Sequence, residues 1–395
     1  MRISLFLCLT ICNSLSAFTH VSVGAESAII MNADTGGVLF EKNSRLQQFP
    51  ASTTKVATAA YILDQHISLL DQKVTASKEA LKSISGAEKK RSKYARPAYW
   101  LEPDGTHIGL KEGESLEVSD LLYGLMLASG NDAANVIAEA ACGDVPRFIA
   151  ALNDYMRGLG ALDTNFCNPH GLHHPEHRTT AYDMALLTAL ALKNSEFRKI
   201  VSTVKYRRPK SNMQQGWTIV QSNQLLKTGR FNYPAAIGVK TGYTSAAQRN
   251  LVAAATKDGR TLIAVLMKCK ERDVLYQDVI ALFEAAFNEP MVERLVLRKG
   301  VKNYSCMVEG GANPLATYIP MDVTVQYYPS EEPQIDALIH WKDLKLPINK
   351  DDAVGEIIVY ENNNVTAIVP LLAQADVQAT WSHWLWSFMA RDQGR

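Results

Sequence analysis

The sequence predicts a sheet covered by helices on its faces, followed by a smaller all-β domain. Strand-like runs at residues 28–31 and 38–40, and again between 235 and 267, bracket a long block of helical patterns. Strands that enclose helices in this way favour one sheet with a helical subdomain inserted between its strands. Past Pro290 the pattern changes to short strand-like runs separated by turn residues, which indicates a small all-β domain.

The size and charge of the chain agree with this organisation. Its 395 residues, 47% of them hydrophobic, are enough for two domains with real cores. The 41 basic and 40 acidic side chains leave a formal net charge of +1. Binding to nucleic acid needs clustered excess Lys and Arg, so nucleic acid is not expected as a partner.

The elements follow in order along the chain. A hairpin signal at Asp34–Gly37 is followed by an alanine-rich helix that opens at Pro50 and runs through Leu63. The basic run at 82–96 is expected to be a solvated loop. Further helices are predicted at 118–127, 132–141, 147–159, 181–192 and 274–287, and strands at 235–239, 250–255, 261–267, 323–328, 335–341, 356–360 and 366–371.

The N-terminus is typical of a secretory signal. Arg2 precedes an apolar run at 3–11, and Val23-Gly24-Ala25 provides small residues for cleavage. A membrane span is the alternative, but Asn13 and Ser14 interrupt the apolar run well before the ~20 residues that a span needs. We therefore expect a signal peptide at 1–25, a first domain at 26–289, a β domain at 290–375 and a terminal segment at 376–395.

Four cysteines remain after residue 25: Cys142, Cys167, Cys269 and Cys306. They are far apart and show no C-x-x-C spacing, which disfavours a zinc cage built from cysteines. An exported protein is free to form disulfides, and four cysteines allow three pairings. The sequence leaves free thiols and disulfides both open.

The first motif with chemical potential is Ser52-Thr53-Thr54-Lys55. Positions i and i+3 of a helix share a face, so the Ser52 hydroxyl and the Lys55 amine can meet there. A serine needs a neighbouring base to become a nucleophile, and a lysine serves as that base only when it is neutral. A second S-x-x-K, Ser202 to Lys205, lies in an alternating, β-like stretch, where these positions face opposite sides.

The second motif is Ser129-Gly130-Asn131, between two helical segments. A loop there presents a hydroxyl and an amide to a cleft. The alternative is an ordinary helix N-cap made by Ser129, Asn131 or Asp132.

The third motif is Lys240-Thr241-Gly242, at the end of the apolar run 235–239. A cation and a hydroxyl at a strand end suit a ligand that carries a carboxylate and lies along the strand edge. A second K-T-G, at Lys227, follows no apolar run and is expected in a loop.

Together, in this order and on these elements, the three motifs resemble those of the serine D-alanyl-D-alanine carboxypeptidases, the low-molecular-mass penicillin-binding proteins of peptidase family S11. The resemblance extends from about Ser27 to the C-terminus and includes the stretches 168–172, 181–185, 346–348 and 354–355. It implies the α/β (α+β) penicillin-binding, β-lactamase-like transpeptidase fold, with an antiparallel sheet, a helical subdomain and a C-terminal all-β domain.

The resemblance also implies a reaction. Ser52 attacks the carbonyl between the two terminal D-alanines of a peptidoglycan stem pentapeptide, and Lys55 accepts its proton. Ser129 passes a proton to the leaving D-alanine, and Asn131 holds the substrate amide. β-Lactam antibiotics are expected to be covalent inhibitors, and no metal or other cofactor is expected.

Substrate binding follows from the third motif in the same way. The N–H groups of Ser52 and Tyr243 form the oxyanion hole implied by the resemblance. Lys240, Thr241 and the neighbouring Gly242 bind the substrate, with Lys240 and Thr241 on the terminal carboxylate. Lys240 is also expected to keep Lys55 neutral by repulsion between like charges. Arg272 lies where the family carries a further cation.

One departure from the family pattern and several alternatives stay open. Gln248 occupies a position where the family usually has glycine, so it is expected to narrow the cleft or shift the strand. Four histidines within eight residues, His170, His173, His174 and His177, raise the alternative of a zinc peptidase, but H-E-x-x-H is absent. A serine β-lactamase, a DD-endopeptidase and a non-catalytic wall-binding protein are further alternatives.

The C-terminal segment carries a cluster of aromatic residues. On a helix, Trp381, Trp384, Leu385, Phe388 and Met389 form one apolar stripe, too short to span a membrane but suited to its interface. The alternative is a helix packed on the β domain. We expect residues 376–395 to anchor an exported enzyme peripherally, in the periplasm or on the outer face of the cytoplasmic membrane.

Overall fold

The structure of the chain is a computed structural model that describes residues 21–382. The chain divides into two compact units, with the division between Asn288 and Glu289. The sequence placed the boundary one residue later. The two units are described separately.

The centre of the first unit is an antiparallel five-stranded sheet, and its N-terminal hairpin lies beside strands from the end of the unit. The strand order is β2-β1-β9-β8-β7. The bounds are Ser27–Asn32 for β1, Val38–Lys42 for β2, Ala236–Thr244 for β7, Gln248–Lys257 for β8 and Arg260–Cys269 for β9.

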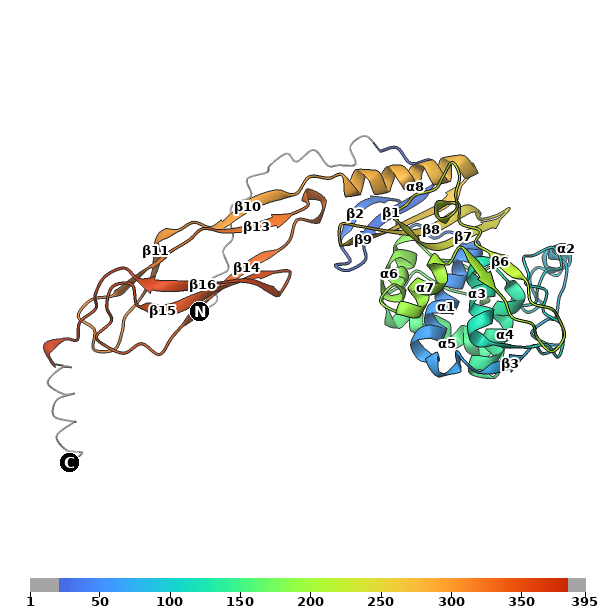
Figure 1. The fold of residues 1–395 in the computed structure, drawn as a ribbon, viewed down its shortest axis with the longest axis horizontal. Helices are drawn as coiled ribbons and strands as arrows, with labels where there is room; N and C mark the ends of the chain where they lie inside the picture. Colours follow the sequence, from blue (N-terminus) through green and yellow to red (C-terminus); the bar gives the residue numbers. More distant parts are fainter. Residues whose placement is uncertain (1–20, 383–395) are drawn as a thin grey trace, which may run out of the picture. The chain divides into compact units, whose positions relative to one another are not determined.

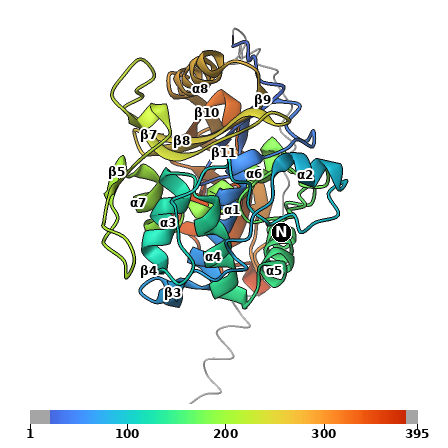
Figure 2. The same ribbon diagram turned by 90° about the vertical axis from the view of Figure 1, so that its right-hand side faces the viewer.

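Both faces of this sheet are apolar, and alternate residues of each strand supply two separate cores. On β9, Ile263, Val265 and Met267 pack into the core on the side of the helical block. Leu262, Ala264 and Leu266 of the same strand pack into the core beneath α8 (Arg272–Phe287). The period of two places successive side chains on opposite faces. Figure 2 shows the sheet between α8 and the remaining helices.

The helical block is built around α1 (Thr54–Gln65), which begins at the predicted S-x-x-K motif. Ten of its twelve residues are buried, because it packs against helices on several sides and against the sheet. Figure 1 shows this helix among its neighbours. They are α3 (Val118–Leu127), α4 (Asn131–Cys142), α5 (Val145–Gly158), α6 (Ala181–Ala191) and α7 (Ser195–Ser202).

Short elements connect these helices and surround the sheet. They are η1 (Ala51–Thr53), η2 (Ile67–Leu69), β3 (Lys73–Thr75), α2 (Gly86–Arg91), β4 (Ser115–Glu117), β5 (Lys205–Arg207), β6 (Thr218–Val220) and η3 (Gln224–Leu226).

Two local predictions in this unit were wrong. The basic run at 82–96 contains the helix α2, and Lys89 is buried where it forms an ion pair with Glu102 at 3.2 Å. Residues 195–202, left without a prediction, form α7, so Ser202 ends a helix rather than belonging to a strand. In both cases the residues are charged or polar in the sequence, but the fold buries their apolar parts or the apolar residues between them.

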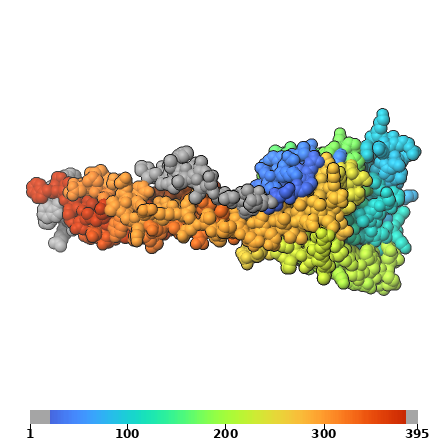
Figure 3. Space-filling view, turned by 90° about the horizontal axis from the view of Figure 1, so that it is seen from above, coloured from blue at the N-terminus to red at the C-terminus, as the bar shows by residue number. Residues whose placement is uncertain are grey.

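The folded first unit also begins earlier than residue 26. Val23 and Ala25 are buried, and the Lys42 ammonium donates to their carbonyl oxygens at 2.7 and 2.8 Å. The Gly24 N–H donates to the Asp278 carboxylate of α8 at 2.7 Å. In Figure 3 the N-terminal part of the described chain, in blue, lies beside the yellow-orange part of the chain, the colour range that includes α8. Residues 23–25, which precede the boundary predicted after residue 25, are therefore packed on the first unit.

The second unit is all-β, as predicted, and has its own core. A five-stranded sheet has the order β11-β12-β16-β15-β14, and β10 and β13 form a separate pair. Ile348 and Val354, in the stretches that resemble the family's C-terminal domain, are buried in this core. The elements are β10 (Val292–Leu297), β11 (Gly300–Cys306), β12 (Leu315–Ile319), β13 (Val323–Tyr327), η4 (Pro329–Glu331), β14 (Ile335–Trp341), β15 (Ala353–Glu361) and β16 (Asn364–Ala373).

The end of this unit differs from the predicted helix at 376–395. Val377 pairs with Ile348 and Ala379 with Gly311 as antiparallel bridges, so the chain is still extended there. Trp381, 77% exposed, is the first helical residue. The other members of the predicted stripe, from Trp384 onward, lie outside the described residues. Within residues 21–382, no helix is both long and apolar enough to cross a bilayer.

Candidate active site

Ser52 lies in a tight turn that leads into α1. The turn is the single 3-10 turn η1, and the hydroxyls of Thr53 and Thr54 donate to the carbonyls of Pro50 and Ala51 at 2.8 and 2.9 Å. These bonds tie both hydroxyls to carbonyl oxygens of the turn itself and hold its shape. The turn therefore directs Ser52 away from the packed side of α1, to the surface of a cleft.

Two glycines and an asparagine hold this turn from outside. A Cβ on Gly242 of β7 would lie 2.9 Å from the Pro50 oxygen, and one on Gly171 would lie 1.9 Å from the Ala51 oxygen. Only glycine permits such close backbone approaches. The Asn250 amide of β8 donates to the Pro50 carbonyl at 2.8 Å. Motifs distant in sequence thus fix the position of Ser52.

Lys55 occupies the next turn of the helix and is fully buried. Its Nζ lies 3.0 Å from Ser52 Oγ, 2.7 Å from Asn131 Oδ1 and 2.6 Å from the His170 carbonyl oxygen. The last two groups only accept hydrogen bonds, so a neutral amine gives both of its N–H groups to them. Its remaining lone pair then faces the Ser52 hydroxyl, as a base must.

Burial lowers the pKa of Lys55 well below its usual 10.5, and the neighbouring Lys240 charge lowers it further, against an opposing effect of Asp132. Lys240 is itself buried, and burial lowers its pKa to about 7. Its Nζ donates to the Thr241 carbonyl at 2.9 Å. The structure thus places Lys240 beneath the cleft surface, whereas Thr241 lines the cleft.

The Ser129-Gly130-Asn131 motif joins α3 to α4 and lines the same cleft. Gly130 is the N-cap residue of α4, without a side-chain capping bond, so the capping alternative for Ser129 and Asn131 was wrong. The Asp132 carboxylate instead accepts N–H groups from residues 108–110 at 2.8–3.0 Å. This anchors a neighbouring cleft wall and leaves the Ser129 hydroxyl and the Asn131 amide to the cleft.

The cleft has a volume of about 480 Å³ and brings together the three motifs. β7 supplies Thr241, Gly242 and Tyr243 along one side, and Arg272 comes from the first turn of α8. Of the nine predicted site residues, all except the buried Lys55 and Lys240 line it. The site combines the Ser52 hydroxyl, a buried amine of lowered pKa behind it, and the Arg272 guanidinium with further hydroxyls along the cleft.

Comparison with known proteins agrees with this geometry. A family sequence model described as D-alanyl-D-alanine carboxypeptidase matches residues 14–271, more than half of the chain. The chain belongs to the D-alanyl-D-alanine carboxypeptidase family. It is therefore a serine-type D-Ala-D-Ala carboxypeptidase, and the predicted penicillin-binding fold is confirmed.

Individual members of the family are similar over most of their length. The D-alanyl-D-alanine carboxypeptidase DacD of Salmonella typhimurium is 30% identical over 90% of this chain and 87% of its own. DacF of Bacillus subtilis is 29% identical over 90% and 86%. The structure of penicillin binding protein 5 from Haemophilus influenzae covers 90% of this chain and 98% of its own at 26% identity, with a TM-score of 0.60.

Sequence reasoning missed several residues of this carboxypeptidase cleft. Ser222 lies with its Oγ 3.1 Å from Thr241 Oγ1, yet it comes from an irregular segment after β6 without a recognisable pattern. Arg249 also lines the cleft. Arg249 and Asn250 directly precede the apolar run 251–255, and two polar residues at the end of a buried strand could have indicated a site.

The histidine-rich segment does not form a zinc peptidase site. The His170 ring contacts the Tyr99 carbonyl and the Leu172 N–H, and the His177 ring contacts Thr54 and the Cys167 N–H. Both rings are buried supports of the loop behind Lys55. None of the four histidines is among the residues that line the cleft.

The second copies of the motifs lie elsewhere. Ser202 is exposed at the end of α7, and its Oγ donates to the Lys199 carbonyl at 3.3 Å. Lys227 follows the 3-10 turn η3 in a loop, as predicted. Neither lines the cleft. The four cysteines after residue 25, for which the sequence left two possibilities, are free thiols.

Gln248 does not narrow the cleft, contrary to the expectation. It begins β8 opposite Thr244 and lines a different cavity, with residues 24–26. Its φ is +56°, a left-handed conformation that favours glycine. A glycine at this position would therefore ease the backbone conformation and would not change the space in the cleft.

Replacing Gln248 by glycine should stabilise the first unit. A non-glycine residue in the left-handed region costs roughly 1–2 kcal/mol, and the greater chain entropy of glycine offsets part of this gain. We expect Gln248→Gly to raise the free energy of unfolding by about 0.5–1 kcal/mol, measured by denaturant unfolding. Gln248→Ala is the control and should give no gain. A loss of stability in the glycine variant would contradict the expectation.

Proposed function

We propose that Ser52 carries the acyl group while the enzyme removes the terminal D-alanine from peptidoglycan stem pentapeptides. The Ser52 Oγ bonds to the penultimate D-alanine carbonyl carbon, and the bond from that carbon to the terminal amide nitrogen breaks. The Oγ proton goes to Lys55, and the leaving nitrogen takes a proton through Ser129. Water then hydrolyses the ester and restores Ser52.

The carrying observation is the environment of the Lys55 amine. Burial and the Lys240 charge lower its pKa, and its two further contacts are acceptors, so in the neutral form the lone pair is free to accept the proton of Ser52 Oγ, 3.0 Å away. Lys55 alone can therefore accept the Ser52 proton, and the proposal needs no other base. A positioned general base of this kind typically contributes about 10²–10⁴ in rate.

The other cleft groups fit the remaining parts of the substrate. A Cβ on Gly242 would lie 3.1 Å from the Ser52 nitrogen, so this strand runs directly past the Ser52 N–H. The N–H groups of Ser52 and of Tyr243, the residue after Gly242, are proposed to form the oxyanion hole. One such donor is typically worth about 3–4 kcal/mol of barrier. Thr241 and Arg272 line the cleft and are proposed to hold the terminal carboxylate. Lys240, from beneath, is proposed to act through its charge on Lys55.

Product analysis tests this function directly. The purified protein should release free D-alanine from a monomeric pentapeptide muropeptide and should become covalently labelled by a fluorescent penicillin. A cross-linked muropeptide in a parallel assay separates carboxypeptidase from endopeptidase action. A protein that takes the label but releases no D-alanine from the pentapeptide would contradict the proposal.

We also propose that the protein is exported and held at the membrane surface by its C-terminal segment. The support is the spacing of Trp381, Trp384, Leu385, Phe388 and Met389 in the sequence, and the exposure of Trp381 where the folded unit ends. The segment contains few cations, so apolar burial rather than anionic lipid should dominate binding.

A truncation tests the anchor without disturbing the fold. Deleting residues 381–395 leaves the bridges at Val377 and Ala379 intact. The truncated protein should move from the membrane fraction to the soluble fraction and keep its penicillin labelling. Retention in the membrane fraction would contradict the anchor.

A further inference from the structure

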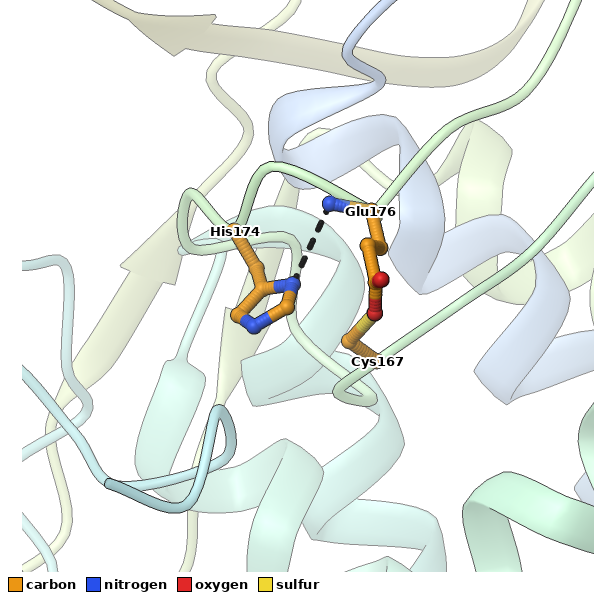
Figure 4. Close-up of side chains that lie close together, drawn as sticks. All are labelled: Cys167, His174 and Glu176. Carbon is orange, nitrogen blue, oxygen red and sulfur yellow. Dashed lines mark hydrogen bonds between the residues drawn. The ribbon is translucent and has the colours of Figure 1, made fainter. Parts of the chain in front are cut away.

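Three side chains with different metal-binding atoms meet on the loop between α5 and α6. The Cys167 thiol, the His174 ring and the Glu176 carboxylate each offer one ligand atom, and these atoms lie within 4.8 Å of one another. Figure 4 shows the three side chains converging from a single stretch of the chain. None of them lines the active-site cleft.

We propose that Cys167, His174 and Glu176 bind a divalent transition-metal ion of the zinc class. Sulfur, imidazole nitrogen and carboxylate oxygen are the ligands that zinc takes in proteins, with water as a fourth. Bonds of about 2.0–2.3 Å hold the ligands of a tetrahedral site less than ~4 Å apart, so the three atoms need to approach by about 1 Å. Glu176 is exposed on a loop and is free to make that adjustment.

Uptake of such an ion exchanges it for one proton. Cys167 is a free thiol and binds a metal only as the thiolate, whereas the neutral imidazole of His174 and the carboxylate of Glu176 bind without losing a proton. Binding then forms the metal–sulfur bond, releases the thiol proton to solvent and releases water from the ion.

The hydrogen bonds that compete with the metal are long. Glu176 N–H donates to His174 Nδ1 at 3.2 Å, the contact drawn in Figure 4. The Asn165 amide donates to Cys167 Sγ at 3.6 Å. The contact to His174 Nδ1 is at the long end of the usual range, and sulfur is a weak acceptor, so little is lost if the ion takes over one of these atoms.

The place of the cluster in the fold indicates support rather than catalysis. Cys167 and His174 bracket the segment 168–173, which contains the His170 carbonyl bound to Lys55 and the Gly171 packed on the Ser52 turn. An ion that binds the three side chains only where the fold brings them together stabilises the folded state by mass action. We therefore expect the metal to stabilise the fold without taking part in acylation. This inference does not depend on the proposed function.

Titration of the purified full-length protein with Co²⁺ tests the site. Binding through Cys167 should give a thiolate-to-cobalt charge-transfer band that saturates at one ion per chain and is abolished by Zn²⁺. Cys167→Ser should lose the band. Glu176→Gln and His174→Gln should each lower the affinity for Zn²⁺ at least tenfold, measured by competition with a chromogenic chelator. Cys306→Ser, a half-buried thiol of the second unit, is the matched control and should behave as the parent.

Unfolding temperature and penicillin labelling complete the test. Zn²⁺ should raise the unfolding temperature of the parent and of Cys306→Ser but not that of Cys167→Ser. Absence of the band in the parent, or its persistence in Cys167→Ser, would overturn the metal site. Penicillin labelling should survive a chelator. Loss of labelling on chelation would overturn the supporting role assigned to the ion, whereas failure of the proposed function would appear as absent labelling with or without metal.

Discussion

Ser52→Ala should abolish both the covalent penicillin label and the release of D-alanine. The Ser52 hydroxyl held against the Lys55 amine is lost, and no covalent intermediate can form on alanine. Loss of a serine nucleophile in other hydrolases lowers kcat by on the order of 10⁶, so the remaining activity should be undetectable. Gel fluorescence with a labelled penicillin, together with a D-alanine assay, measures both effects.

Ser202→Ala is the matched control for this experiment. Ser202 belongs to the second S-x-x-K but is exposed at the end of α7 and does not line the cleft. This variant should keep full labelling and full turnover. Labelling that survives in Ser52→Ala would mean that the nucleophile is elsewhere.

Lys55→Met should slow acylation by about 10²–10⁴ while leaving the chain folded. Methionine retains the length and the apolar stem of lysine but offers no base. It also leaves the Asn131 and His170 oxygens without their donor, at a cost of about 1–3 kcal/mol each if both stay dry. Lys205→Met, on the exposed second motif, is the control and should acylate normally. A normal acylation rate in Lys55→Met would refute the role of the amine.

The pH dependence provides an independent check on the same base. Burial and the Lys240 charge hold the pKa of Lys55 below 10.5, and only the neutral amine accepts the Ser52 proton. The acylation rate should therefore rise with pH through the pKa of Lys55 in the folded protein and then reach a plateau. Lys55→Met should lose this rise.

Lys240→Met should move the rise toward higher pH. Without the like charge nearby, the protonated form of Lys55 is less disfavoured, so its pKa goes up. Burial gives Lys240 a pKa of about 7, so the displacement should be largest below that pH, where Lys240 is charged. Rates measured with a saturating β-lactam separate this effect from weaker binding. An unchanged profile would contradict the electrostatic role of Lys240.

Much of the fold was predictable because its patterns are local. The helix at 118–127 and the strand at 335–341 were predicted with their observed bounds. Their ends are visible in the sequence because the periodic apolar pattern stops where turn residues begin. α2 was missed because Lys89, a charged residue in the sequence, is buried there. α7 was missed because its one apolar face, Phe197, Ile200 and Val201, lies among charged residues. Residues 23–25 were assigned to a signal because they are small and follow an apolar run, as a cleavage site does. Small residues also pack closely, so the sequence pattern is the same for both situations.

By itself the sequence determined the three motifs that meet at the site, although not every residue of the cleft. The spacing of Ser52 and Lys55 on one helix is a local property, and the order of the three motifs along the chain identified the family. Only the tertiary structure decided how they act. The lowered pKa of Lys55 depends on the burial of its amine and on the Lys240 charge, which comes from a strand 185 residues further along the chain, and neither effect has a local signal. Burial and charge are properties of the assembled surroundings, so they exist only once the chain has folded.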